Sequence, residues 1–317
     1  MVCEDVPFTA HPHIINKEKS TMENIKNLMN MIGVSSDAQI AVLNGYECLL
    51  KDGSINELKE VSEKIMEDFK TEKYLLFLEK INSPDRNAEV NKYMVACIFI
   101  LLCSIHLKKC YLKKGISEKI YIDSTMDIWC KMKECKKRYG IWGIVSSTWF
   151  WGLFAMKIFK LGRLQFQTAN VWFDGCEKIN VKKGDETLFI HIPSDGPLLP
   201  EEVISSLEYA YSFYGCEGKV PFFLHSWLTQ PGNENIFPEN SNLSWLYEQF
   251  TVFDFEDDDF RDCWRIFNMD YDGNPDKLPQ DTNLQKNIVS YLKNGGRMGC
   301  GYGVLLFDGK DIYRPAL

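Results

Sequence analysis

A histidine at the end of a predicted strand is the residue best suited to chemistry in this sequence. The run Val220–Leu228 is short, apolar and rich in aromatic residues, which predicts a buried strand. His225, Ser226 and Trp227 lie at its C-terminal end, where open α/β sheets bind their ligands. The imidazole pKa lies near neutrality, so His225 could be a general base, although a structural histidine that hydrogen bonds under a loop is at least as good an interpretation. His225 and Ser226 point to opposite faces of a strand, so they cannot form a nucleophile–base pair.

A short helix is predicted directly after the loop that follows this strand. Pro238 precedes it, and Asn240–Ser244 supply several possible N-cap side chains. Leu243, Leu246 and Phe250 follow at the spacing of one apolar helix face. The helix should therefore pack this face against the strand region.

The stretch Asn240–Gln249 resembles the last motif of the GNAT acetyltransferase superfamily, commonly Asn-x-x-Ala-x-x-Leu-Tyr-Glu-Lys. The resemblance implies that Asn240 lies beside the pantetheine arm of an acyl-CoA and that Tyr247 protonates the departing thiolate. Leu243 stands where the motif has a small residue, and the usual glycine after the motif is missing. On the residues alone, Tyr247 could equally lie on a plain surface helix with its hydroxyl in water.

Motifs along the chain resemble, in order, a bacterial family of acyltransferase-domain-containing proteins. Those proteins pair a helical N-terminal domain with a GNAT-like C-terminal domain, and the resemblance spans most of residues 20–306. The matching stretches are Leu161–Gln167, His191–Pro193, Leu224–Leu228, Ser241–Asn242, Trp264–Phe267, Leu278–Pro279, Thr282–Gln285 and Gly295–Gly303. The resemblance implies an N-acyltransferase that moves an acyl group, expected to be acetyl, from acyl-CoA to a small-molecule or peptide amine.

The same resemblance places the coenzyme at a strand, a tight loop and a helix N-terminus, where the helix dipole favours a pyrophosphate. Glu186–Ile192 is the predicted strand and Leu199–Tyr214 the predicted helix. The expected coenzyme-binding residues are Ser194, Gly196, Leu198, Leu199, Ser226, Trp227, Asn240 and Asn242. The loop has one glycine and a proline, unlike the glycine-rich GNAT loop. A plain strand-to-helix turn, in a non-catalytic GNAT-like binding module, is therefore the alternative.

Helical periodicity dominates the chain up to about residue 160. The predicted helices are Ser20–Asn30, Ser36–Leu50, Ile55–Lys70, Asn87–Lys109, Ser117–Tyr139 and the aromatic-rich Trp142–Lys160. At Leu161–Gln167 the period changes to two, with Arg163, Gln165 and Gln167 alternating with apolar residues. We therefore expect an α+β protein, with an all-helical domain over residues 1–160 and a GNAT-like mixed α/β domain over residues 161–317.

Composition and charge indicate an acidic globular protein with two domains. The chain has 317 residues, is 45% hydrophobic and 25% charged, and carries a net charge of −8. It has no electrostatic footprint for nucleic acid. The 11 cysteines lack zinc-site spacing, so we expect reduced thiols in a cytoplasmic protein. Met1–Pro12 lacks a secretory signal, and Met94–Leu107 is too short to span a bilayer, so no membrane partner is expected.

Three further patterns have weaker functional interpretations. Asp270–Asp281 begins like a calcium loop, but Pro275 stands where the turn needs glycine, so no metal is expected. The acidic cluster Asp254–Asp259 is expected to line the acceptor side and attract a cationic amine. The glycine-rich Arg297–Gly303 precedes the predicted strand Val304–Phe307, whereas a nucleotide loop would follow a strand. These glycines therefore predict a bend or a close backbone approach.

Overall fold

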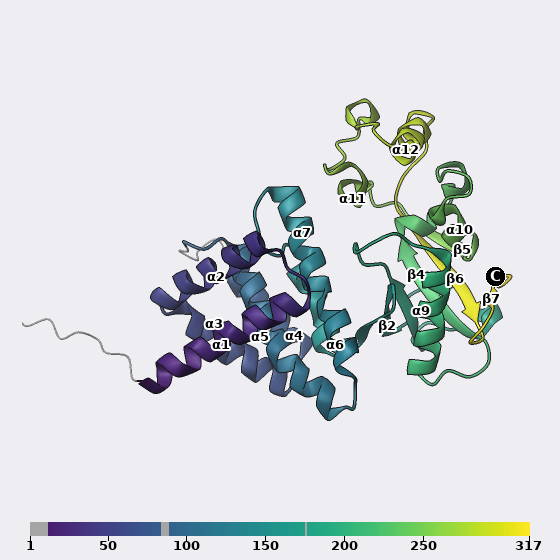
Figure 1. Cartoon of the computed structure of the whole chain (residues 1–317). Helices are drawn as coiled ribbons and strands as arrows, with labels where there is room; N and C mark the ends of the chain where they lie inside the picture. Colours follow the sequence, from purple (N-terminus) through teal and green to yellow (C-terminus); the bar gives the residue numbers. More distant parts are fainter. Residues whose placement is uncertain (1–11, 84–88, 175) are drawn as a thin grey trace, which may run out of the picture. The chain divides into compact units, whose positions relative to one another are not determined.

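The computed structural model describes residues 12–83, 89–174 and 176–317, which divide into two compact units. The first unit contains the described residues up to Cys135 together with Ile141–Phe154. The second contains Lys136–Gly140 together with the described residues of Ala155–Leu317. Figure 1 shows the helical first part of the chain and the sheet of the later part.

Helices form the first part of the chain, as predicted. They are α1 (Pro12–Met31), α2 (Ser36–Lys51), α3 (Ser54–Glu67), α4 (Thr71–Asn82), α5 (Lys92–Lys113), α6 (Glu118–Thr125), α7 (Asp127–Tyr139), η1 (Ser147–Phe150) and α8 (Trp151–Phe154). The apolar helix α5 is buried from Met94 to Ser104, which confirms its prediction as a core helix. Among the described residues it is also the one helix long and apolar enough to cross a bilayer. The predicted start of this helix at Asn87 lies outside the described residues.

Two helix predictions in this part are wrong. The helix predicted over Ser117–Tyr139 is interrupted at Met126, which ends α6 and precedes α7. The helix predicted over Trp142–Lys160 is replaced by η1, α8 and a strand. Met156 has a left-handed backbone (φ 52°) between α8 and this strand, so a continuous helix cannot form there.

A seven-stranded mixed sheet forms the core of the second unit. The strands are β1 (Ile158–Leu161), β2 (Leu164–Asn170), β3 (Glu186–His191), β4 (Val220–Ser226), β5 (Thr251–Glu256), β6 (Cys300–Phe307) and β7 (Ile312–Tyr313). Their order is β1-β2-β3-β4-β6-β5, and β7 pairs with β6. Only β3 and β4 are parallel among the described pairs. This mixed sheet after a helical region confirms the predicted α+β fold class.

Short helices and turns connect the strands of this sheet. They are η2 (Glu177–Ile179), α9 (Pro200–Phe213), η3 (Trp227–Thr229), η4 (Asn233–Asn235), α10 (Asn242–Glu248), α11 (Cys263–Phe267), η5 (Pro275–Lys277) and α12 (Asn283–Lys293). The predicted strand Leu161–Gln167 is in fact the hairpin of β1 and β2, which pair antiparallel. Gly162 lies in the turn of this hairpin. Its backbone has a φ of 77° there, a conformation that glycine adopts without strain.

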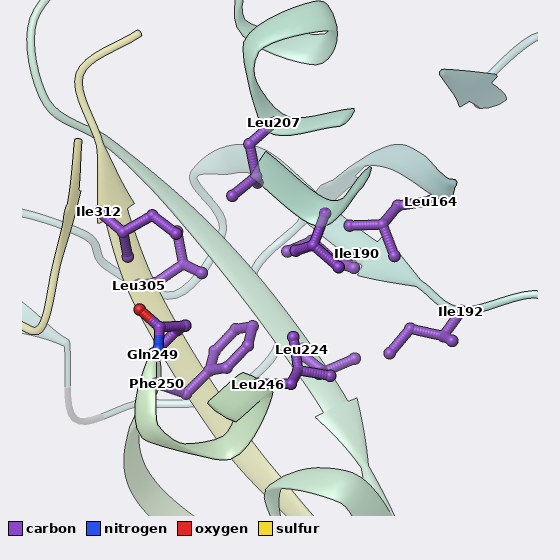
Figure 2. Close-up of a pocket in the computed structure, with 11 residues that line it drawn as sticks. Leu164, Ile190, Ile192, Leu207, Leu224, Leu246, Gln249, Phe250, Leu305 and Ile312 are labelled. Atoms are coloured by element: carbon purple, nitrogen blue, oxygen red, sulfur yellow. The ribbon is translucent and has the colours of Figure 1, made fainter. Parts of the chain in front are cut away.

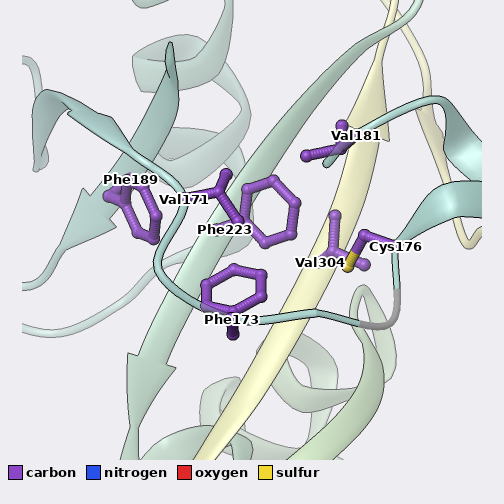
Figure 3. Packing of buried hydrophobic residues seen from close by; sticks show 7 residues of the cluster. All are labelled: Val171, Phe173, Cys176, Val181, Phe189, Phe223 and Val304. Atoms are coloured by element: carbon purple, nitrogen blue, oxygen red, sulfur yellow. The ribbon is translucent and has the colours of Figure 1, made fainter. Parts of the chain in front are cut away.

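The sheet has two faces with different coverings. Side chains of a strand alternate between faces, and the β3–β4 register fixes which residues share one. We call the helix face the one that carries Leu188, Ile190, Phe222 and Leu224. We call the aromatic face the one that carries Phe189, His191, Phe223 and His225. On the aromatic face, side chains of the segment after β2, such as Val171 and Phe173, form a buried cluster with Phe189 and Phe223 (Figure 3).

The glycines of β6 permit a close backbone approach, as predicted. A Cβ atom on Gly301 would lie 1.8 Å from the carbonyl oxygen of Thr229. The Thr229 hydroxyl donates to the Gly301 carbonyl oxygen at 2.8 Å, and the Gly299 N–H donates to Gln230 at 2.8 Å. The strand begins at Cys300, earlier than the predicted Val304, so Gly301 and Gly303 belong to the strand, whereas Gly299 precedes it.

Candidate active site

The parallel strands β3 and β4 separate towards their C-terminal ends. Their register pairs Leu188 with Phe222 and Phe189 with Phe223, although β3 continues to His191 and β4 to Ser226. We call this opening the β3–β4 splay. Backbone N–H groups at such an opening can donate hydrogen bonds to an acyl oxygen instead of to a neighbouring strand.

An apolar pocket lies on the helix face beside the splay (Figure 2). Ile190 of β3 and Leu224 of β4 line it from the two separating strands. Leu207 of α9 and Leu246 of α10 line it from the helices. Gln249 is the polar residue among the lining side chains, but its polar atoms do not face the pocket. The pocket is a small apolar gap with room for about one water molecule, so a ligand arm would have to widen it.

His225 lies on the aromatic face at the end of β4. Its ring stacks on Tyr302, with centroids 4.0 Å apart and an interplanar angle of 16°. Its Nε2 atom lies 3.3 Å from a carboxylate oxygen of Glu256, which makes the contact electrostatic without the geometry of a hydrogen bond. Burial lowers the pKa of His225, and Glu256 opposes this effect. The imidazole is therefore neutral at neutral pH, the form that a base requires.

His191 is a second candidate base that the sequence reasoning did not identify. Continuing the register of β3 and β4 places it opposite His225, on the same face of the sheet. Its Nε2 atom lies 2.7 Å from the Gln167 side-chain oxygen. Because the side-chain oxygen of Gln167 is an acceptor, Nε2 of His191 carries a proton in this contact. The signal was in the sequence, since His191 also ends a predicted strand.

Tyr247 lies on α10 and donates its hydroxyl proton to Glu234 at 2.9 Å. Burial raises the pKa of Tyr247 to about 12, and the Glu234 carboxylate contributes to the shift. A phenol with this pKa holds its proton more tightly than a thiol, whose ordinary pKa is about 8.5. Tyr247 would have to leave Glu234 to protonate a thiolate, so its role as an acid stays a prediction.

The residues around the start of α10 are local capping groups. Ser241 is the N-cap, and its hydroxyl accepts from the Ser244 N–H at 3.1 Å, as the predicted cap region requires. Asn242 is the first helical residue. Asn240 precedes the cap with a left-handed backbone at φ 58°, a conformation that asparagine tolerates. Proximity of Asn240 and Asn242 to a pantetheine arm stays a prediction.

The residues after β4 connect this strand to α10. The Ser226 hydroxyl accepts from the Leu228 N–H at 3.2 Å and caps η3. Trp227 packs edge-on against Phe237 at 6.0 Å, and Phe237 packs edge-on against Tyr247 at 6.1 Å. These rings fix the position of α10 relative to the end of β4. Coenzyme binding by Ser226 and Trp227 stays a prediction.

Buried charges hold the loop between β3 and α9. Arg163 donates to the carbonyl oxygens of Gly196 at 2.6 Å and Pro197 at 2.8 Å. Arg163 and Lys160 also pair with the two carboxylate oxygens of Asp195 at 2.9 and 2.7 Å. Arg163 is only 9% exposed, so its predicted place on the polar side of a half-buried strand is wrong. It lies in the β1–β2 turn, and its charge is compensated by the loop.

The β3–α9 loop does not form a glycine cradle for a phosphate. A Cβ atom on Gly196 would meet nothing within 4 Å, and its backbone has no positive φ. The Leu198 side chain is buried, and Leu199 is the N-cap of α9 without a side-chain cap hydrogen bond. At the start of α9, Pro200 has no N–H group, and Glu201 and Glu202 lie in the first turn, so few donors remain there for a coenzyme phosphate. The roles of Ser194, Gly196, Leu198 and Leu199 stay predictions.

The described residues contain no group of three or more His, Cys, Asp or Glu side chains that could hold a metal ion. In the stretch that begins like a calcium loop, the Asp272 carboxylate pairs with Lys277 at 2.5 Å. Every described cysteine is free, and Cys97, Cys103 and Cys263 are buried, as predicted.

Comparisons with known proteins match both parts of the chain. Residues 23–156 match the family described as the N-acyltransferase N-terminal domain, and residues 158–305 match the GNAT-like C-terminal domain. No curated protein matches the sequence.

Solved acyltransferase structures have a similar fold. One is an acyltransferase mutant in complex with octanoyl-CoA, at 19% identity and a TM-score of 0.69, which covers 89% of this chain and 87% of that chain. Another is an acyltransferase in complex with decanoyl-CoA and teicoplanin, at 19% identity, a TM-score of 0.67 and the same coverage. A third, in complex with CoA and 10C-teicoplanin, has 18% identity and a TM-score of 0.64, and covers 88% of this chain and 86% of that chain.

Proposed function

Because this chain belongs to the family in which an N-acyltransferase N-terminal domain precedes a GNAT-like C-terminal domain, we propose that it is an acyl-CoA-dependent N-acyltransferase. The β3–β4 splay carries the proposal. It separates an apolar pocket on the helix face from two histidines on the aromatic face. Such an opening lets a thioester reach basic side chains while its long arm stays on the other side of the sheet.

The pantetheine arm of the acyl-CoA would occupy the pocket between α9 and α10. The pocket has an apolar lining for the methylene and methyl groups of the arm, and the lining side chains would have to move apart to admit it. The pyrophosphate would then lie at the N-terminus of α9, where the helix dipole and the remaining backbone N–H groups favour an anion. The thioester would lie at the splay.

The reaction at the splay needs a base, an oxyanion site and a proton for the leaving group. His225 or His191 takes a proton from the ammonium form of the acceptor, and the free amine nitrogen then attacks the thioester carbonyl. Backbone N–H groups at the splay stabilise the negative oxygen of the tetrahedral intermediate. The C–S bond breaks as the amide forms, and the CoA thiolate takes the second nitrogen proton, directly or through Tyr247, which is protonated again at the end.

The acyl group need not be acetyl, the group that the sequence favoured. The similar acyltransferases were solved with octanoyl-CoA and decanoyl-CoA, so we include medium-chain acyl groups in the proposal. The second structure also contains teicoplanin. For this chain we propose an amine on a small molecule or peptide.

Thermal unfolding with a series of coenzymes tests the proposal. Acetyl-, octanoyl- or decanoyl-CoA at about a hundred times its Kd should stabilise the chain by about 2.7 kcal/mol, because ligand binding favours the folded state. The substitution Ile192→Trp should abolish the effect, since it places a large ring in the pocket lining. Ile141→Trp, at an exposed position, is the control.

The outcomes separate the active enzyme from a non-catalytic binding module. If no acyl-CoA stabilises the wild-type chain at millimolar concentration, the chain is a binding module that has lost the coenzyme. If Ile192→Trp still responds like the wild type, the coenzyme lies elsewhere. Stabilisation by one chain length above the others would identify the acyl group.

A further inference from the structure

A half-exposed tryptophan lies beside His225 on the aromatic face. One face of the Trp172 indole stacks on Phe189, with centroids 4.8 Å apart and an interplanar angle of 17°. Its edge meets His225 at 6.4 Å and Tyr302 at 6.3 Å. Nevertheless, 47% of Trp172 remains exposed. The ring is therefore held firmly from one side while its outer face stays open to a ligand.

The electrostatic surroundings of the imidazole are negative. The carboxylates that act on it belong to Glu256, Asp258 and Asp262, and Arg261 opposes them. Arg261 pairs with Asp258 at 3.1 Å, whereas Arg265 pairs with Asp262 at 2.8 Å. Arg261 is 3.6 Å from Glu256, a longer contact. Glu256 is thus the least compensated of these carboxylates, and 46% of its side chain is exposed.

We propose that Glu256 and the outer face of Trp172 form, with His225 between them, an acceptor subsite for a protonated amine attached to an apolar or planar body. A carboxylate attracts the ammonium group, and an indole face binds both a cation and a flat apolar group. The inference rests on the proposed function, because the bound amine is the acyl acceptor. It gives a substrate class to the site that the splay opens.

The subsite also accounts for the proton balance of acyl transfer. An amine enters as the ammonium ion, which cannot attack a carbonyl carbon because its nitrogen has no free electron pair. Neutral His225 takes one proton, and the amine nitrogen forms the C–N bond as the C–S bond breaks. The second proton from nitrogen passes to the CoA thiolate, so the products are the amide, CoA and one proton on His225.

Binding of two matched probes to the full chain without acyl-CoA tests the subsite. The probes are phenethylamine, which is protonated at neutral pH, and 2-phenylethanol, which has the same ring without the charge. Nuclear magnetic resonance of His225 and of the Trp172 indole N–H reports binding at the site. We expect the amine to shift both signals and to bind more tightly than the alcohol, by up to about fivefold, as one exposed ion pair allows.

Two substitutions should separate the contributions of charge and ring. Glu256→Gln should remove the preference for the amine, and Asp257→Asn should not, because Asp257 pairs with Arg297 at 3.0 Å instead. Trp172→Leu should weaken both probes, with Tyr209→Leu as a control at another exposed aromatic position of the same unit. Trp172→Phe keeps an aromatic ring against Phe189. It replaces the leucine variant in the binding test if Trp172→Leu has a lower melting temperature than the wild type.

Three results would overturn the proposed subsite. The two probes could bind with equal affinity, Glu256→Gln and Asp257→Asn could have equal effects, or the His225 signals could stay unchanged up to the solubility limit of the probes. The test does not depend on coenzyme binding. A chain that is stabilised by acyl-CoA but does not discriminate the probes keeps the proposed function and loses this subsite. A chain that discriminates the probes but is not stabilised by acyl-CoA keeps an amine-binding site and loses the proposed acyl-CoA-dependent function.

Discussion

Two histidines at the ends of adjacent strands could each supply the base, and their contacts differ. His225 has a carboxylate beside Nε2 and an aromatic ring against one face. His191 has a neutral amide partner. A carboxylate stabilises the imidazolium that forms when the base takes a proton, whereas an amide oxygen mainly fixes the tautomer. We therefore propose His225 as the base and His191 as a residue that orients the substrate or the strand.

We expect His225→Gln to keep acyl-CoA binding and to lower turnover by about 10²–10⁴-fold, the usual contribution of a general base. The loss should shrink at high pH, because more of the acceptor is then already the free amine. Burial lowers the pKa of His225 below the ordinary 6.5, so wild-type activity should persist down to a more acidic pH than an exposed histidine would allow. A pH–rate profile of both forms measures this.

His191→Gln is the matched control for that experiment. If His191 is structural, its variant should keep activity per folded molecule and lose about 1–3 kcal/mol of stability, the cost of an unsatisfied partner. If the His225 variant is active but less stable and the His191 variant is inactive, His191 is the base and His225 is the structural residue. Melting temperature and specific activity on the same samples decide between them.

At this scale the sequence predicted residue types better than partners. His225 was selected from its place at the end of a predicted strand, and Tyr247 from the resemblance to the GNAT motif; the roles of both stay predictions. Their neighbours Glu256 and Glu234 come from other segments, and no local pattern indicates such contacts. Burial of Arg163 was not predictable for the same reason, since its partners lie in the loop after β3.

At the scale of the elements, the close contact between η3 and β6 requires glycine at position 301. We expect Gly301→Ala to destabilise the chain by about 1–3 kcal/mol or more, because the new methyl group would overlap the Thr229 carbonyl oxygen. Gly196→Ala is the control, since a Cβ atom there meets open space, and its stability should stay within about 0.5 kcal/mol of the wild type. Urea unfolding of both variants measures the difference, and equal midpoints would contradict the close packing of η3 on β6.

Periodicity predicted the elements that have a uniform environment and failed where the environment changes. Helix α9 was predicted from Pro200 and its acidic first turn, and both are present. The break at Met126 has no proline or glycine to indicate it, and Met126 itself keeps a right-handed helical backbone (φ −58°, ψ −22°). The β1–β2 hairpin was read as one strand because Gly162 was its only turn signal.

On the scale of the molecule, the helical region should fold as a domain of its own. Helix α5 packs against α1, α2, α3, α4 and α6, and these contacts lie within one unit. We propose that the domain boundary lies near residue 160, and we expect a fragment of residues 1–156 to be helical and to unfold cooperatively. Circular dichroism with thermal unfolding tests this. A strand-rich spectrum, or a gradual loss of signal without a transition, would contradict it.

The β3–β4 splay also has a mechanical consequence. It divides the sheet into two ribbons, β1-β2-β3 and β4-β6-β5 with β7, joined along one short parallel seam. The antiparallel ladder of β4 and β6 runs from Val220–Phe307 to Ser226–Gly301, so each ribbon is better tied within itself than to the other. Thermal fluctuations should therefore widen the β3–β4 pairing before they open the longer antiparallel ladders, such as that of β4 and β6, and amide hydrogens there should exchange earlier than those of the longer ladders. A ligand that contacts both ribbons would hold them together. Amide hydrogens at the β3–β4 pairing should then exchange more slowly when the ligand is bound.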